Sequence, residues 1–238
     1  MKKLFSLLLA LSLLLSACSA PKAEPGPLLT LLGNGYAYLV GQEMDGEFVN
    51  IQEGENYKKF DLTKAQDYLL VPSEGEPFTL SGTGEAAHLV SATGTYEIPV
   101  DFENAEKINS ELSYIAIGGA TKDAVIPKTV IDENGSFTAD FDGDGITETI
   151  LVEKSPFGDD GSTMVMLLWK NASGDTKALT SLITGDNYLS GFTLFAADIN
   201  ADKKAELILT ASGHDYMTEV FTVSSAGASY IGGYHMGN

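Results

Sequence analysis

Apolar residues along most of the chain occur in short runs, with turn-forming residues between them. The runs are rich in Val, Ile, Tyr, Phe and Thr, and the intervals contain Gly, Asn, Asp or Pro. This pattern is typical of an all-β protein. Helical patterns are short, at residues 63–70 and 104–112. In the first half of the chain, strands are predicted at residues 36–40, 48–52, 78–81, 88–91, 95–100 and 114–117.

The second half of the chain contains an internal repeat. Two acidic segments, residues 140–148 and 198–206, carry oxygen-bearing side chains at positions 1, 3, 5 and 9. A strand-like run precedes each segment and three more follow it, so each unit has the four antiparallel strands of a propeller blade. The predicted strands are residues 136–139, 149–152, 163–171 and 177–183 in the first unit, and 192–197, 207–210, 217–224 and 228–234 in the second.

The predicted fold class is therefore all-β, with two antiparallel blade-like units at residues 134–238 and a β-rich region at residues 30–133. Two blades do not close a ring. Either the two units pack on the N-terminal region, or that region supplies two divergent blades and completes a four-bladed propeller.

The two acidic segments have the chemistry of calcium loops. Calcium takes about six to eight oxygen ligands, and alternate side chains of a short loop can supply most of them. A backbone carbonyl at position 7 completes each predicted set, and Gly145 permits a sharp turn in the first loop. The predicted ligands are Asp140, Asp142, Asp144, the Ile146 carbonyl and Glu148 in the first loop, and Asp198, Asn200, Asp202, the Lys204 carbonyl and Glu206 in the second.

The second loop has one carboxylate fewer, and Lys203 stands where the first loop has glycine, so we expect it to bind calcium more weakly. One or two calcium ions are thus predicted. The alternative is a pair of acidic turns that bind no metal, and a filled site can also serve only to shape its blade. Neither loop is an EF-hand, since position 12 of the first is Leu151, within a predicted strand.

These loops resemble the calcium loops of FG-GAP/VCBS-type repeats, which occur in integrin α-subunit propellers and in many bacterial surface proteins. The resemblance covers residues 134–238 and rests mainly on the first loop. It implies that each loop joins the first two strands of a blade and binds calcium. Glu148 and Glu206 stand where that family has a final Asp.

The N-terminus has the pattern of an export signal. Lys2 and Lys3 precede an apolar run at residues 4–17, which is shorter than the roughly 20 residues needed to span a bilayer. The run ends in Leu15-Ser16-Ala17-Cys18, which resembles the lipobox of bacterial lipoproteins. That resemblance implies cleavage after residue 17, lipid on Cys18 and anchoring in the bacterial cell envelope, outside the cytoplasm. Residues 18–29, rich in Pro and Ala, are then the lipidated cysteine and a flexible tether.

The amino-acid composition limits the classes of partner that the protein can bind. The formal charge of −19 repels phosphate backbones, so nucleic-acid binding is excluded, and the single cysteine leaves no disulfide. The sequence predicts a lipid-anchored, calcium-binding surface protein that acts as a binding module for a protein or glycan ligand, and it identifies no catalytic residue. Two alternatives remain: an exported hydrolase that acts on polysaccharide or cell-wall material through an Asp/Glu pair, and a structural envelope protein.

Overall fold

The computed structural model describes residues 26–32, 36–50, 66–82, 97–99, 105–120, 122–124, 135–171, 173–185, 189–213 and 216–236. These residues confirm the all-β class, with antiparallel sheets in both halves of the chain. Cys18, the apolar run before it and the strand expected at residues 88–91 lie outside the described residues. No helix in the described part of the chain is long and apolar enough to cross a membrane.

The N-terminal strands form one seven-stranded sheet in the order β3-β2-β1-β7-β4-β5, with β6 paired to β2. This order differs from two successive four-stranded blades, so these strands do not supply the divergent blades of a four-bladed ring. The strands are β1 (Leu28–Leu32), β2 (Tyr36–Met44), β3 (Glu47–Asn50), β4 (Asp67–Pro72), β5 (Phe78–Ser81), β6 (Glu97–Pro99) and β7 (Ser113–Gly118).

Three details of this region differ from the expectations. Residues 67–70, expected in a helix, belong to β4, because four successive side chains from Tyr68 to Val71 are buried, alternately on the two faces of the sheet. Of the second expected helix only the 3-10 turn η2 (Ala105–Lys107) is present among the described residues. β1 begins inside the segment assigned to the tether, because Leu28 pairs with both β2 and β7 and is 1% exposed.

The C-terminal strands form one eight-stranded sheet, in which two four-stranded units are joined through a single parallel residue pair, Thr184 with Leu189. Each unit is an antiparallel meander, as the repeat predicted. The first unit contains β8 (Ser136–Ala139), β9 (Glu148–Phe157), β10 (Ser162–Lys170) and β11 (Thr176–Thr184). The second contains β12 (Leu189–Ala197), β13 (Glu206–Gly213), β14 (Tyr216–Ser224) and β15 (Gly227–Met236).

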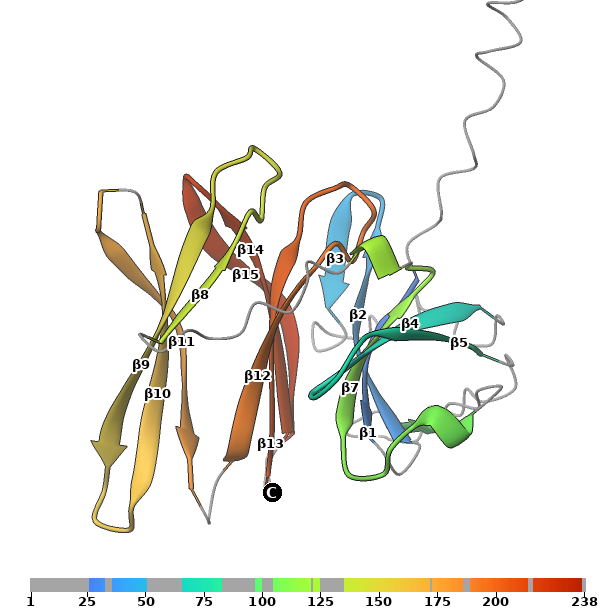
Figure 1. Ribbon diagram of the computed structural model, residues 1–238, viewed down its shortest axis with the longest axis horizontal. Helices are drawn as coiled ribbons and strands as arrows, with labels where there is room; N and C mark the ends of the chain where they lie inside the picture. The colour runs from blue at the N-terminus through green and yellow to red at the C-terminus, as the bar shows by residue number, and fades with distance from the viewer. Residues whose placement is uncertain are drawn as a thin grey trace, which may run out of the picture.

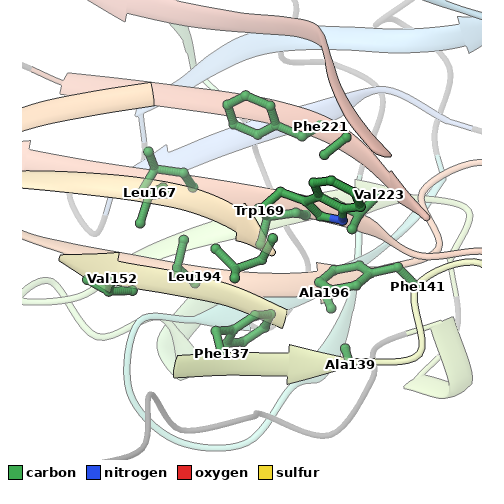
Figure 2. Packing of buried hydrophobic residues seen from close by; sticks show 14 of the residues in the cluster. Phe137, Ala139, Phe141, Val152, Leu167, Trp169, Leu194, Ala196, Phe221 and Val223 are labelled. Carbon is green, nitrogen blue, oxygen red and sulfur yellow. The ribbon is translucent and has the colours of Figure 1, made fainter. Parts of the chain in front are cut away.

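The N-terminal sheet and the two C-terminal units stack as three layers, with the second unit in the middle (Figure 1). One face of the second unit packs on the first unit around Trp169, Phe137 and Phe221, as Figure 2 shows. The opposite face packs on the N-terminal sheet. The two blade-like units therefore pack on the N-terminal region, the first of the two arrangements that the sequence allowed.

Successive side chains along the strands of the middle layer point alternately to its two faces, so they contribute to the cores on both sides of this layer. In β12, Leu194 and Ala196 face the first unit, whereas Phe195 and Ala197 face the N-terminal sheet. β13 follows the same rule and is buried from residue 206 to residue 211. A sheet buried on both faces needs apolar side chains at successive positions, which explains the continuous apolar runs in these strands.

Phe195 lies in the core between the middle layer and the N-terminal sheet and is 5% exposed. We expect Phe195→Ala to lower the free energy of unfolding by about 3–5 kcal/mol, because it leaves a cavity between two sheets. Urea denaturation measures the change. The exposed Ser181→Ala is the control and should change stability by less than about 0.5 kcal/mol. An equally small effect of Phe195→Ala would contradict the layered packing.

Candidate metal centre

Each acidic loop joins the first and second strands of its unit. The first loop connects β8 to β9, and the second connects β12 to β13. The strand register is the same in both units, since Ala139 pairs with Glu148 and Ala197 pairs with Glu206. The structure thus confirms that the two loops are equivalent parts of a repeated unit.

The same hydrogen bonds from backbone amides to side-chain oxygens hold both loops. The side chain at position 1 accepts a hydrogen bond from the backbone amide of position 6, and the side chain at position 3 accepts one from the amide of position 5. The side chain at position 5 accepts from the amide of position 7, and the side chain at position 9 accepts from the amide of position 2. In the first loop the N···O distances are 3.0 Å (Gly145 to Asp140), 3.3 Å (Asp144 to Asp142), 2.7 Å (Ile146 to Asp144) and 2.9 Å (Phe141 to Glu148). In the second they are 2.9 Å (Lys203 to Asp198), 3.0 Å (Asp202 to Asn200), 2.8 Å (Lys204 to Asp202) and 3.2 Å (Ile199 to Glu206).

The glutamate at position 9 is buried in both loops, and Glu148 and Glu206 are each 4% exposed. Burial raises the pKa of Glu206 to about 8, although the Ile199 amide opposes the change. Burial also raises the pKa of Glu148, and the neighbouring aspartates add to that effect while the Phe141 amide opposes it. A nearby cation would favour the charged form of both carboxylates.

Three of the predicted ligands of the first loop lie close together. Single carboxylate oxygens of Asp140, Asp142 and Glu148 all lie within 4.8 Å of one another, so this group can hold a metal ion. Asp140 Oδ1 and Glu148 Oε1 are buried and accept no hydrogen bond. Buried oxygens without a donor are costly unless something such as a cation satisfies them. An all-oxygen set of this kind suits a hard cation such as calcium.

The other predicted ligands are placed differently. Asp144 lies outside this group, and one of its oxygens accepts the Ile146 amide. Ile146 is 59% exposed, so its side chain takes no part in the core. Within the part of the chain that the structure describes, the second loop has no group of three acidic or histidine ligands as close as that of the first.

The two loops contact each other, which the sequence pattern did not indicate. The Ala205 amide donates a hydrogen bond to the Phe141 carbonyl at 2.7 Å. A Cβ atom added to Gly143 would lie 3.2 Å from the Lys203 carbonyl oxygen, so the backbones are in close contact there. Asp142 Oδ2 also accepts the Ser225 amide, in the turn between β14 and β15, at 3.2 Å. These contacts join residues far apart in sequence.

Both loops use left-handed backbone conformations at positions 4 and 6. In the first loop these positions are glycines, with φ of 72° at Gly143 and 84° at Gly145. In the second loop they are Ala201 (φ 58°) and Lys203 (φ 75°). Side chains other than glycine are strained by about 1–2 kcal/mol in this region. The second loop therefore keeps the shape of the first at an energetic cost.

We expect Lys203→Gly to raise the free energy of unfolding, by up to about 1 kcal/mol, because glycine relieves the strain at φ 75°. Thermal unfolding measures the change. The neighbouring Lys204→Gly removes the same charge at a position without positive φ, and it should not stabilise the protein. If the two variants have equal melting temperatures, the strain in the second loop is absent.

Residues 140–209 match the family model of the FG-GAP-like repeat. The matched segment begins at the first residue of the first loop and ends within β13, so it contains both loops. No curated protein and no solved structure matches the chain. This part of the chain is therefore similar to FG-GAP-like repeats, as the two loops predicted, and such repeats are typical of interaction modules of the β-propeller type.

Proposed function

We propose that the protein is a calcium-binding interaction module, anchored by lipid on Cys18 to the outer side of a bacterial membrane. The observation that supports it most strongly is the oxygen group of Asp140, Asp142 and Glu148, two of whose buried oxygens accept no hydrogen bond. A calcium ion bound there would supply positive charge to these oxygens and would offset the mutual repulsion of the carboxylates.

In this proposal calcium stabilises the contact between the two units. Asp142 lies in the first unit, where it is part of the oxygen group, and it accepts a hydrogen bond from the backbone amide of Ser225 in the second unit. Phe141, which lies between Asp140 and Asp142 in the sequence, is fully buried in the core between the units. An ion that fixes the first loop therefore also fixes side chains at the interface. The role of the calcium ion in this proposal is structural, and a ligand binds elsewhere on the module.

The cell-envelope location depends on the sequence alone. The run at residues 4–17 and the four residues ending in Cys18 support export and lipid attachment. Two or more acyl chains would anchor the protein stably, where a single chain is marginal. The acidic composition then keeps the exposed module soluble and away from anionic lipid headgroups.

Calcium should raise the melting temperature of the soluble chain, from residue 19 onward, because it binds the folded loops. A ligand at about 100 times its dissociation constant adds roughly 2.7 kcal/mol of stability. Magnesium should raise it less, since it needs tighter octahedral coordination. Asp142→Ala should remove most of the calcium effect, Asp144→Ala a smaller part because Asp144 lies outside the oxygen group, and Asp202→Ala the least.

Asp159→Ala is the matched control, since it removes one exposed carboxylate in the turn between β9 and β10. It should leave the calcium effect unchanged. Thermal unfolding with calcium and with chelator measures all the variants. Equal melting temperatures of the unaltered protein in the two conditions would rule out the calcium proposal.

The raised pKa of Glu206, to about 8, makes the stability of the metal-free protein depend on pH. Between pH 4.5 and about 8, Glu206 keeps its proton in the folded state and loses it in the unfolded state. The free energy of unfolding therefore falls as pH rises through this interval. In chelator, Glu206→Gln should therefore gain stability over the unaltered protein as pH rises from about 5.5 to about 8. A difference in melting temperature that does not change with pH would contradict the burial of this carboxyl.

Cys18→Ser should abolish incorporation of labelled fatty acid in a bacterial host, because serine has no thiol to accept the lipid. The chain should then remain unprocessed or appear in the soluble fraction. Cell fractionation and metabolic labelling measure both effects. Normal labelling of the variant would show that the lipobox interpretation is wrong.

A further inference from the structure

A cleft lies between the N-terminal sheet and the middle layer, at the end of the strands opposite the second acidic loop. It is bordered by the first residues of β12 and the last residues of β13, whereas the second loop joins the other ends of these strands (Figure 1). Its volume of about 570 Å³ lies within the usual range for small-ligand sites. None of its lining residues belongs to the predicted calcium loops.

Hydroxyl groups dominate the described lining of this cleft, and no basic residue is among them. Only Glu74 and Glu111, both exposed, bring charged side chains. An anionic ligand would find no positive partner on these residues and two negative ones. The lining therefore suits an uncharged ligand rich in hydroxyl groups. The hydroxyl-bearing residues include Thr30, Ser190, Thr193, Ser212 and Tyr216.

An aromatic ring is held at the wall of the cleft. Tyr216 is half-buried and stacks on Tyr38, with ring centroids 5.9 Å apart and an interplanar angle of 25°. Tyr38 in turn stacks on Tyr234 at 5.0 Å. The buried rings behind Tyr216 restrict its movement, so binding would cost little side-chain entropy. A tyrosine ring offers an apolar surface and a polar tip, which matches the C–H faces and hydroxyls of a sugar.

One of the hydroxyls that line the cleft, that of Thr30, is buried and bonded to the middle layer. Thr30 of β1 and Thr218 of β14 are 6% and 0% exposed, and their Oγ1 atoms are 2.6 Å apart. This hydrogen bond joins the N-terminal sheet to the middle layer next to Tyr216. On the β12 side, Ser190 Oγ donates to the Ser212 carbonyl at 2.7 Å and fixes that edge of the wall. The polar lining is thus an ordered part of the interface between sheets.

We propose that this cleft binds a neutral glycan. One sugar ring lies against Tyr216, its hydroxyls bond to the serine and threonine side chains, and the carboxylates of Glu74 and Glu111 accept hydrogen bonds from further hydroxyls. The proposal names the ligand class of the interaction module proposed above and rests on that function, but it does not depend on calcium. Hydrogen bonds to charged acceptors are the stronger ones, so the two glutamates favour hydroxyl donors over acidic sugars.

The test uses the full chain, purified in a detergent without a sugar headgroup. The probes are three neutral trisaccharides (cellotriose, maltotriose and tri-N-acetylchitotriose) and the anionic tri-galacturonic acid. Isothermal calorimetry in excess calcium measures binding. At least one neutral probe should bind, and tri-galacturonic acid should bind at least tenfold more weakly. No binding of any neutral probe at about 10 mM would overturn the proposal.

Two variants locate the site. Tyr216→Ala removes the ring, and Thr193→Tyr fills the cleft from β12 while leaving Tyr216 in place, so each should weaken binding at least tenfold. Tyr230→Ala is the matched control, because Tyr230 is 50% exposed and lies outside the cleft lining. Unchanged binding by the two cleft variants, or an equal loss in the control, would overturn the proposal.

The calcium-dependent rise in melting temperature is measured for the same variants. A cooperative unfolding transition shows that each variant is folded, whether or not calcium raises its melting temperature. An unchanged calcium effect then separates a failure of the glycan proposal from a failure of the calcium proposal. New reducing ends in the probe would show that the cleft hydrolyses glycans, and the binding-module proposal would then be wrong.

Discussion

The burial of one glutamate at the start of the second strand of each unit determines the shape of both acidic loops. Glu148 and Glu206 extend from a strand into the protein, where each accepts a hydrogen bond from the amide of loop position 2. A buried carboxyl group without such a partner would be destabilising. The bond closes the loop and directs the residue at position 2 into a core. In the first loop, oxygens of Asp140 and Asp142 lie within 4.8 Å of an oxygen of Glu148.

This closed loop connects the local chemistry to the stacking of the sheets. Phe141 packs between the two units, whereas Ile199, the equivalent residue of the second loop, packs between the middle layer and the N-terminal sheet. The two loops therefore contribute to different cores, and the Phe141 carbonyl accepts a hydrogen bond from Ala205. The Asp198 amide bonds in addition to the Ala124 carbonyl of the N-terminal region. All three layers are thus joined at the end of the molecule where the loops lie.

The sequence predicted the repeated half of the fold well because its signals are local. Alternation, turn residues and the spacing of the aspartates placed every strand from β8 to β15, and they placed both loops between the correct strands. The order of the N-terminal sheet depends on pairings such as that of Leu28 with Ile117, which no local pattern specifies. Residues 67–70 were misassigned to a helix because an apolar run buried on both faces lacks the alternation of an exposed strand.

The candidate site was predicted only in part, because local sequence patterns predict contacts within one loop but not contacts between sheets. Asp140, Asp142 and Glu148 converge as expected, since a single hairpin fixes their positions. The contact between Asp142 and Ser225, and the cleft that combines Thr30, Ser113 and Ser212, depend on the stacking of sheets. The most direct test of the central claim is a crystal structure grown in calcium. It should show an ion about 2.3–2.6 Å from oxygens of Asp140, Asp142 and Glu148. A first loop of unchanged shape without an ion at those oxygens would contradict the account.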